Sequence, residues 1–379
     1  MTLIKILHVA SFTGNIGDNA SHIGLYSILR NILGDNFEVE KVEIRRFYKN
    51  YSLSDKMHFD DKFVEMANKK DLLIVGGGGF FDYWVPNSST GTTIDMSKEV
   101  LEKLFVPTLF VSVGCMPHQS IPEGNIDRLH SFLTALCHKQ NVRIALRNDG
   151  SLSEIRRLFG SEFDNKIQEI LDNGFFYKPN PKIGCLLSES PYIAINTTLD
   201  QLSMQNRIIG KIDYGVFKKE FCNLVKCIIE KTEYSIVFVP HIYKDIQAFG
   251  EILKDINDFY IRSRIIIAPY IQGDYGCNML LSVYQNSSYV VGMRFHSNVC
   301  PIAMKKPITG LAALDRVVHL YDSIDKSDDV ALVSRDFCEK IYCRLSQTDY
   351  NYNLDIIDRK RQHSLSIYRS FLTETGVIG

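Results

Sequence analysis

Short apolar runs alternate along the first half of the chain with segments in which apolar positions recur every three or four residues. The runs predict strands at Leu3–Ala10, Val39–Phe47, Asp71–Val75, Thr108–Gly114 and Arg143–Arg147. The periodic segments predict helices at Asn19–Leu33, Asp55–Asn68, Ser97–Phe105, Ile126–His138 and Ser151–Phe159. A repeated strand–helix order is typical of a parallel sheet, so this half is expected to form a Rossmann-like domain.

The same alternation returns in the second half of the chain. Strands are predicted at Tyr192–Asn196, Ser235–Pro240, Arg264–Tyr270, Tyr289–Arg294 and Pro307–Leu311, and helices near Tyr214–Lys231, Lys244–Asn257, Cys277–Asn286 and Ser297–Met304. Between the halves, residues Asp172–Ile183 are rich in turn-forming Asn, Gly and Pro and are interpreted as a linker. We therefore expect one domain over residues 1–178 and a second over residues 179–379. A final helix near Leu354–Thr373 could pack back on the first domain.

The fold class that follows is α/β, with two Rossmann-like domains and parallel sheets. Two such domains facing across a cleft form the arrangement called GT-B in glycosyltransferases. In open parallel sheets, ligands bind beyond the carboxyl ends of the strands. The residues that follow the predicted strands are therefore the candidates for function.

The overall charge and the cysteines exclude several classes of protein. The chain has 379 residues, of which 43 are basic and 44 acidic, so its net charge favours neither nucleic acid nor an anionic membrane as a partner. Its nine cysteines form no CxxC pair, which argues against a disulfide framework and a zinc site. No HExxH motif is present, and we expect no obligatory structural metal.

The hydropathy of the chain indicates its location in the cell. No apolar stretch approaches the ~20 residues that span a bilayer, and the apolar run near the N-terminus reads as a strand and not as a secretion signal. We expect a cytoplasmic protein, and peripheral attachment to the inner face of the plasma membrane is compatible with this sequence.

The first motif, residues 11–20, follows the first predicted strand and opens the first helix. Gly14 and Gly17 allow close approach to the backbone, and Asn15 and Asp18 add polar groups, so this turn is a candidate anion or acceptor site. The alternative is a tight turn in which Asp18 or Asn19 caps the helix. The dinucleotide fingerprint GxGxxG is absent.

The second motif is the run of four glycines at residues 76–79, directly after a buried strand. Gly77 and Gly78 are candidates for close approach of a ligand, although a crowded loop that packs against the protein itself would also need glycine. The aromatic residues that follow could stack on a sugar or could be ordinary core residues: Phe80, Phe81, Tyr83 and Trp84.

Two arginines end predicted strands. Arg147 follows apolar residues, so its guanidinium is expected to emerge at the carboxyl edge of the sheet and to bind phosphate or carboxylate, with a salt bridge to Asp149 as the alternative. Arg294 and His296 end a buried strand two residues apart, and strand alternation points them to one side.

Other polar residues at strand ends in the second half add to this group. His241 lies at the end of another predicted strand, and Ser297 follows His296 at the start of a predicted helix. Asn196 ends the first strand of the second domain and could bind a substrate or simply form a turn. Histidine at such a position is suited to proton transfer near neutral pH.

In their order along the chain, these motifs resemble the polysaccharide pyruvyl transferase family. The resemblance rests on GNIGD at residues 14–18, DLLIVGGGG at 71–79, SVG at 112–114, the arginine-to-serine pattern Arg147–Ser151 and RFHS at 294–297, and it spans roughly residues 3–311. In one place the chain departs from the family pattern. Members often carry an acidic residue directly after the arginine, whereas this chain has Asn148, followed by Asp149.

The resemblance implies a transferase that takes phosphoenolpyruvate as donor and forms a pyruvate ketal on a saccharide or lipid-linked acceptor, without a further cofactor. It implies that Arg294 and His296 act in catalysis and lie in the donor site. We extend the donor site to Arg147, His241 and Ser297 and assign the acceptor to the first domain. In this hypothesis protonated His296 donates to the methylene carbon of the donor, and Arg294 balances the phosphate charge.

Two other functions fit the same elements. A glycosyltransferase with a nucleotide-sugar donor needs two such domains as well, and thermal protection by a nucleoside diphosphate would identify it. The third hypothesis is a non-catalytic sugar-binding protein, although it assigns no function to Arg294 and His296.

Overall fold

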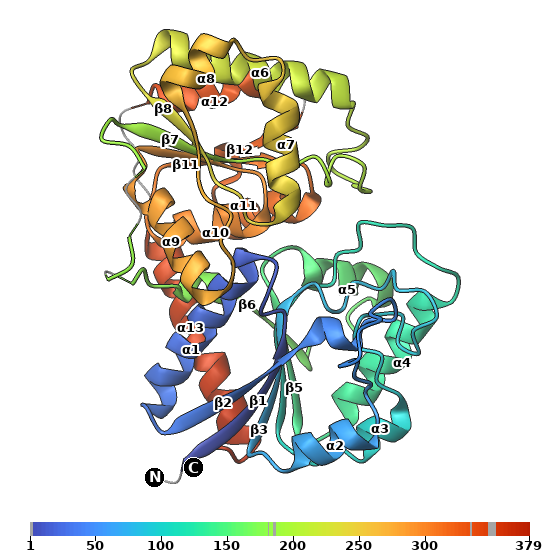
Figure 1. Cartoon of the computed structure of the whole chain (residues 1–379). Helices are drawn as coiled ribbons and strands as arrows, with labels where there is room; N and C mark the ends of the chain where they lie inside the picture. Colours follow the sequence, from blue (N-terminus) through green and yellow to red (C-terminus); the bar gives the residue numbers. More distant parts are fainter. Residues whose placement is uncertain (1–2, 181, 185–186, 334–335, 348–353) are drawn as a thin grey trace. The chain divides into compact units, whose positions relative to one another are not determined.

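The chain folds into two compact units, shown in Figure 1, and the computed structural model describes residues 3–180, 182–184, 187–333, 336–347 and 354–379. Unit 1 consists of Met1–Phe12, Leu25–Asn173 and Ile357–Gly379, and unit 2 of Thr13–Gly24 and Gly174–Ile356. The chain thus passes from one unit to the other at residues 173–174, within the linker that the sequence suggests. Residues 13–24 belong to unit 2 and residues 357–379 to unit 1. The sequence-based division places residues 13–24 in the first domain and residues 357–379 in the second.

Unit 1 contains a six-stranded parallel sheet in the order β2-β1-β3-β4-β5-β6. Its strands are β1 Ile4–Ala10, β2 Phe37–Glu43, β3 Leu72–Gly78, β4 Thr108–Val113, β5 Val142–Arg147 and β6 Ile167–Ile170. Its helices are α2 Asp61–Asn68, α3 Lys98–Glu102, α4 Asn125–His138 and α5 Ser151–Phe159, with the second half of α1 Ile16–Leu33 and most of α13 Leu354–Glu374. Almost every strand residue of β3, β4 and β5 is buried, as expected for a sheet covered on both faces.

The main core of unit 1 lies between the sheet and helices α2 and α4. Leu7 and Phe110 of the sheet belong to the same buried cluster as Phe63 of α2 and Leu133 of α4. Helix α2 begins where the Asp60 carboxylate accepts hydrogen bonds from the first-turn amides of residues 62 and 63. Figure 1 shows α2, α3 and α4 on one side of the sheet, and α1 and α13 on the other.

Unit 2 contains a second six-stranded parallel sheet, in the order β12-β11-β10-β7-β8-β9. Its strands are β7 Tyr192–Asn196, β8 Ser235–Phe238, β9 Ile265–Ile267, β10 Tyr289–Gly292, β11 Ile308–Ala312 and β12 Val330–Leu332. Its helices are α6 Tyr214–Lys231, α7 Tyr243–Leu253, α8 Asp258–Arg264, α9 Gly273–Asn286, α10 Phe295–Ala303, α11 Asp315–Ser323 and α12 Phe337–Leu345. The strand order reverses between β7 and β10, and this switch point is where open sheets of this kind bind ligands.

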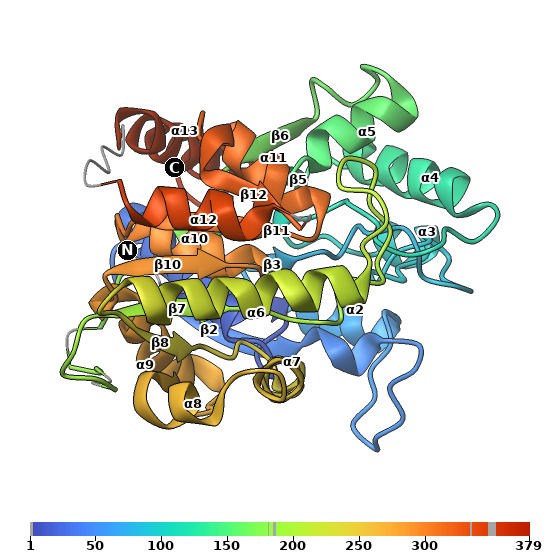
Figure 2. The same ribbon diagram turned by 90° about the horizontal axis from the view of Figure 1, so that it is seen from above.

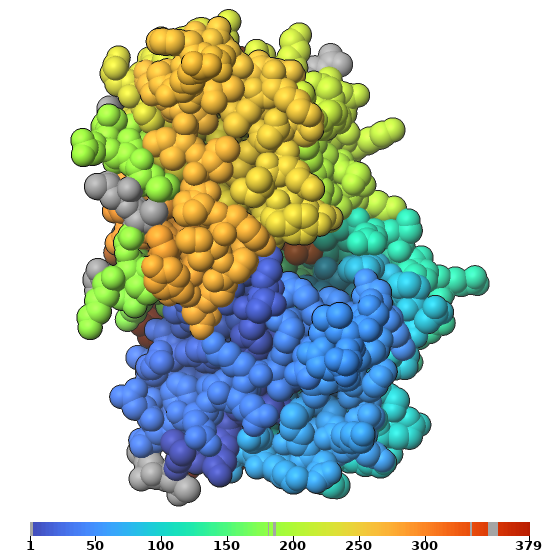
Figure 3. Space-filling view, in the orientation of Figure 1, coloured from blue at the N-terminus to red at the C-terminus, as the bar shows by residue number. Residues whose placement is uncertain are grey.

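One face of the second sheet is covered by α6, α7 and α12, whose apolar residues share a buried cluster with the strands. Phe221 of α6 and Phe249 of α7 both contact Phe238 of β8, with ring centroids 6.3 and 4.9 Å apart. Figure 2 shows α6 running along this sheet. In Figure 3 the visible face of unit 2 is covered by yellow and orange residues, those of α7, α8 and α9, so these helices form a solvent face of the unit.

Several element boundaries differ from the sequence-based prediction. The strand predicted to reach Phe47 ends at Glu43, because the Glu43 side chain accepts a hydrogen bond from the Arg45 amide and starts a 3₁₀ turn over Ile44–Phe47. The prediction missed β6, β12, α8, α11 and α12. The two missed strands have only four and three residues, too few to show a period.

The predicted fold class, with two Rossmann-like parallel sheets, is confirmed. A cleft between the two domains stays a prediction. Among the described residues, no helix combines the length and the apolar character that a membrane crossing requires.

The glycine run at the end of β3 is needed for packing within unit 1. A Cβ on Gly76 would lie 1.9 Å from the Val111 carbonyl oxygen, at the point where the β3–β4 and β4–β5 registers become irregular. The Val111 carbonyl belongs to the backbone of β4, so it cannot move away without distorting the sheet. We expect Gly76→Ala to lower the free energy of unfolding by about 3 kcal/mol or more, as overpacked core substitutions do. Thermal and denaturant unfolding monitored by circular dichroism would measure the loss.

Gly250→Ala is the matched control. Gly250 lies exposed within α7, and no other group lies within 4 Å of the position of its Cβ. This variant should gain about 0.5–1 kcal/mol, because alanine is the better helix former. Equal unfolding midpoints for the two variants would contradict the packing argument.

Candidate functional site

The candidate site of unit 2 lies at the carboxyl ends of β7 and β10, on either side of the switch point. Gly292 of β10 pairs with Asn196 of β7, and the next residues turn directly into α10. The turn is held by its own polar groups, since the Ser297 hydroxyl donates to the Arg294 carbonyl at 2.7 Å and the Asn298 amide donates to the same oxygen at 2.9 Å. Arg294 and His296 are therefore fixed at the start of the helix.

The guanidinium of Arg294 is held by two carboxylates. Its Nε lies 2.8 Å from Oδ1 of Asp245, and its Nη2 lies 2.6 Å from the same oxygen and 3.1 Å from Oδ1 of Asp200. Nη2 also donates to the Thr198 hydroxyl at 2.7 Å. Burial opposes the charge, but the two carboxylates outweigh it and raise the pKa of Arg294. Within the described residues, Nη1 is left without a hydrogen bond.

Asp245 has no exposed surface and accepts hydrogen bonds from several directions. Besides Arg294, its Oδ2 accepts from the Asn196 side chain at 3.2 Å and from the backbone amides of His241 at 2.8 Å and Ile242 at 3.3 Å. The end of β7, the segment after β8 and the end of β10 are thus joined through one carboxylate.

His296 lies in the first turn of α10 and is 5% exposed. A Cβ on Gly17 would lie 2.6 Å from both Cβ and Nδ1 of His296, so the first turn of α1 contacts the histidine directly. The close approach that the first glycine motif predicts is therefore made by a side chain of unit 2.

The first turn of α1 is capped from within its own motif. The Asn15 side chain accepts a hydrogen bond from the Gly17 amide at 3.0 Å, and its carbonyl accepts from Asp18 at 3.2 Å. The cap is Asn15, and not Asp18 or Asn19 as the sequence suggested. Gly14 takes a left-handed φ of 81° before it. The Gly17 amide is thus used by the helix cap, and the binding of an anion or acceptor at this turn stays a prediction.

His241 is fully buried beside this turn. Its Nε2 lies 2.8 Å from the Tyr284 hydroxyl, and its carbonyl accepts from the Ile16 amide at 3.3 Å. Burial, and then the positive charges of Arg294 and His296, lower the pKa of His241 well below its ordinary value. Its Nδ1 has no hydrogen-bond partner in the part of the chain that the structure describes. His241 is therefore a neutral imidazole near the two other candidates.

Asn196 and Ser297, two predicted ligand contacts in unit 2, form hydrogen bonds within the unit. Asn196 donates to the Val239 carbonyl and to Asp245, and its oxygen accepts from the Arg294 amide at 3.0 Å. Both amide hydrogens and one lone pair of the amide oxygen are thus used within unit 2, and the binding of an acceptor by Asn196 stays a prediction. The Ser297 hydroxyl donates to a backbone carbonyl and keeps only its capacity to accept.

Arg147, in unit 1, does not emerge at the sheet edge as the sequence predicted. It is 2% exposed, and its Nε donates to Asp149 at 2.6 Å while Nη1 lies 3.9 Å from Asp172. Burial opposes its charge, but the carboxylates of Asp149 and Asp172 raise the pKa of Arg147. The salt bridge to Asp149, the alternative in the sequence analysis, is the observed arrangement.

The glycines at the end of β3 also make contacts within unit 1. A Cβ on Gly78 would lie 2.6 Å from the Phe80 ring, and Gly77 takes a left-handed φ of 82°. Phe80, Phe81 and Tyr83 are buried, so they belong to the core and do not form an exposed wall for a sugar. At Gly78 the structure shows the crowded packing that the sequence analysis gave as the alternative, and the approach of a ligand at Gly77 and Gly78 stays a prediction.

Sequence reasoning missed the residues that hold the site together. Asp200, Asp245 and Tyr284 contact the candidate arginine and histidine but belong to no motif. Asp245 does carry one local signal, since an aspartate in the first turn of a predicted helix is a common helix start.

Comparison with known proteins places this arrangement in a family. A family model described as polysaccharide pyruvyl transferase matches residues 15–314. Among curated proteins, no sequence matches this chain.

Solved structures share the fold. The UDP-GlcNAc 2-epimerase from Methanocaldococcus jannaschii has a TM-score of 0.56 at 11% identity, over 96% of this chain and 99% of that one. The UDP-GlcNAc 2-epimerase from Neisseria meningitidis bound to UDP-GlcNAc has a TM-score of 0.53 at 11% identity, over 99% and 100% of the two chains. At this identity the likeness shows the GT-B-like fold alone.

The buried neutral His241 predicts a pH effect on stability. The unfolded chain takes up a proton on this imidazole as the pH falls below about 6.5, whereas the folded chain resists it, so acid favours unfolding. We expect the midpoint of thermal unfolding to fall less between pH 7 and pH 5 in His241→Gln than in the original chain. The exposed His138 supplies the control His138→Gln, which should keep the original slope. An unchanged slope in His241→Gln would contradict the assignment.

Proposed function

The chain belongs to the polysaccharide pyruvyl transferase family, and on this premise we propose that it transfers the enolpyruvyl group of phosphoenolpyruvate to a sugar and closes it as a pyruvate ketal. Family membership makes the chain a transferase of polysaccharide biosynthesis. The acceptor in this proposal is a saccharide or lipid-linked oligosaccharide, and the reaction takes place in the cytoplasm or at the inner face of the plasma membrane.

The observation that carries the proposal is the grouping of His296, Arg294 and His241 at the switch point of unit 2. His296 and Arg294 both lie close enough to His241 to lower its pKa. The group sits where ligands bind in such sheets. The N-terminal end of α10, from which His296 projects, favours negative charge. A small anion with a carboxylate and a phosphate suits this place.

The chemistry assigned to His296 is proton transfer. Protonated His296 donates to the methylene carbon of phosphoenolpyruvate, which becomes a methyl group, while one sugar hydroxyl forms a bond to C2 and returns its proton to the imidazole. The C2–O bond to phosphate then breaks, and a second hydroxyl closes the ketal. The proton of that second hydroxyl leaves with the phosphate, so atoms and charges balance. A positioned acid–base group contributes about 10²–10⁴-fold to such a step.

Arg294 supports this step in two ways. Its Nε and Nη2 bind Asp245 and Asp200, which fixes the turn that carries His296. Its Nη1, which makes no hydrogen bond within the described residues, is the nitrogen that we assign to the donor. His241 stays neutral and offers Nδ1 to the same ligand.

His296→Ala tests the acid–base assignment. We expect ketal formation to fall by about 10²-fold or more, because the proton donor is gone, while the circular dichroism spectrum stays unchanged. Mass spectrometry of a glycan acceptor incubated with phosphoenolpyruvate measures the product. His363→Ala, at an exposed position of α13, is the matched control and should keep full activity. Turnover by His296→Ala close to that of the control would remove His296 from the mechanism.

Donor choice separates the proposal from its main rival, a glycosyltransferase that uses a nucleotide-sugar. Phosphoenolpyruvate should raise the midpoint of thermal unfolding in proportion to the logarithm of its concentration above Kd, because it binds the folded state only. UDP and UDP-sugars should leave the midpoint unchanged. Protection by UDP without protection by phosphoenolpyruvate would favour the glycosyltransferase.

A further inference from the structure

A pocket of about 400 Å³ lies in unit 1, away from the strand ends discussed above. It is lined by the last turn of α4, the first residues of β5 and β6, and one side of α13. These are the amino ends of the strands, whereas the sequence motifs lie at the carboxyl ends. Neither the proposed reaction nor the family comparison assigns a role to this pocket.

The polar lining of the pocket is predominantly cationic. Lys139, Arg143 and Lys166 contribute positive charge, and Glu374 is the carboxylate that faces them, so the lining carries a net charge of two positive units. Burial raises the pKa of the Cys137 thiol, which also lines the pocket, to about 11, so the thiol is neutral and does not offset these charges. This excess is local, since the whole chain has a net charge of −1.

Arg143 is held in a fixed orientation. Its Nε donates to Glu374 at 2.7 Å, and its Nη1 donates to the carbonyls of Gln140 and Val142 at 2.8 Å each. Within the described residues its Nη2 makes no hydrogen bond. A guanidinium that is anchored on two sides presents its remaining N–H groups to a ligand with little loss of entropy.

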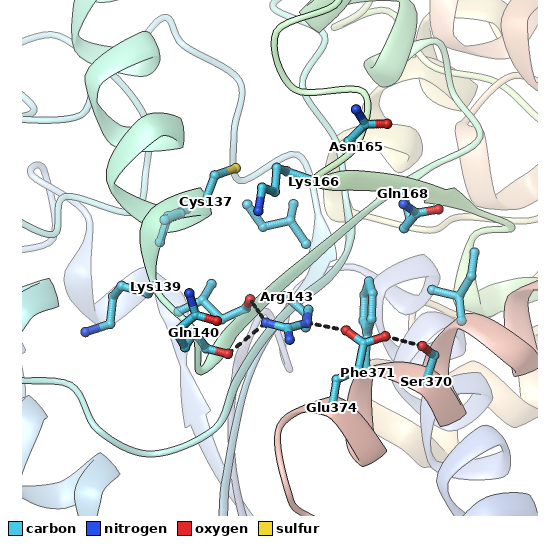
Figure 4. Close-up of a pocket in the computed structure, with 14 residues that line it drawn as sticks. Cys137, Lys139, Gln140, Arg143, Asn165, Lys166, Gln168, Ser370, Phe371 and Glu374 are labelled. Atoms are coloured by element: carbon cyan, nitrogen blue, oxygen red, sulfur yellow. Dashed lines mark hydrogen bonds and ion pairs between the residues drawn. The ribbon is translucent and has the colours of Figure 1, made fainter.

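Lys166 supplies a second cation on the other side of the pocket. Figure 4 shows its ammonium reaching from the start of β6 towards Gln140 and Arg143, while Lys139 points outwards at the rim. In the described part of the chain, the Lys166 ammonium has neither an ion pair nor a hydrogen bond. Its charge is therefore available to a ligand in the pocket.

The remaining lining defines the size and polarity of a ligand. The amides of Gln140 and Gln168 can bind hydroxyl groups, and Ile367 and Phe371 of α13 provide an apolar wall. The volume far exceeds that of a single phosphate, since water takes up about 30 Å³ in the liquid. A phosphate monoester carries close to two negative charges at neutral pH, which equals the net charge of the lining.

We propose that this pocket binds the phosphate monoester of a small polyhydroxy compound such as a sugar phosphate, with the phosphate between Lys166 and Arg143. A ligand in this position would contact β5, β6 and α13. The ion pair between Arg143 and Glu374 already links β5 to α13. This site is independent of the transferase chemistry, because it lies within unit 1 and contains no residue of the proposed mechanism.

Isothermal titration calorimetry of the full chain with glucose 6-phosphate tests the proposal. We expect one saturable site, no binding of glucose, and weaker binding of inorganic phosphate, which lacks the polyhydroxy body. Lys166→Gln should lower the affinity for glucose 6-phosphate at least about tenfold, because it removes a charge-assisted hydrogen bond. Glu374→Gln should tighten the binding of glucose 6-phosphate several-fold, because it raises the net charge of the lining from two to three positive units while its amide oxygen can still accept from Arg143.

Lys62→Gln, at an exposed position of α2, is the matched control and should bind like the original chain. Lys166→Gln should lower the affinity and Glu374→Gln should raise it. General destabilisation would lower the affinity in both variants, so these opposite changes identify a binding role. The absence of saturable binding by glucose 6-phosphate, or equal affinity in Lys166→Gln and Lys62→Gln, would overturn the proposal. Equal affinity for inorganic phosphate and glucose 6-phosphate would overturn the assignment of a polyhydroxy ligand.

Discussion

The arrangement of the candidate site depends on one buried carboxylate, that of Asp245. It accepts hydrogen bonds from Arg294, from Asn196 and from the backbone after β8, so it fixes three chain segments that meet beside the switch point of unit 2. A buried carboxylate without partners would cost several kcal/mol, and this one is stable only because cationic and N–H groups surround it. The position of His296 follows, since the turn that Arg294 anchors leads directly into α10.

The sequence was sufficient for the fold class, and it pointed to candidate residues that the structure brings together in unit 2. Strand and helix periods are local properties, and the residues that follow strands can be read from them, which is why Arg294, His296 and His241 were identified together. The partners of these residues could not be read in the same way. Asp245 lies 49 positions from Arg294 in a helix start, where the sequence alone indicates a helix cap.

The same limit explains the corrections in unit 1. An arginine after an apolar strand was expected to be exposed, but Arg147 is buried against Asp149 of its own loop and against Asp172, which follows the neighbouring strand β6. Because β6 has only four residues, neither the strand nor its acidic neighbour was recognised. For the glycines of residues 76–79, composition shows that something must approach the backbone. Only the structure shows that the approaching groups are the Val111 carbonyl and the Phe80 ring.

The charges around Arg294 limit what it can contribute to donor binding. One guanidinium faces the carboxylates of Asp245 and Asp200, so this cluster is negative by one unit as a whole. It cannot by itself attract a donor that carries both a phosphate and a carboxylate. Under the proposed chemistry, the attraction must come from protonated His296 and from the N-terminal end of α10. Arg294 then acts mainly by holding the turn and offering Nη1, and the imidazole that donates the proton also supplies the positive charge that binds the donor.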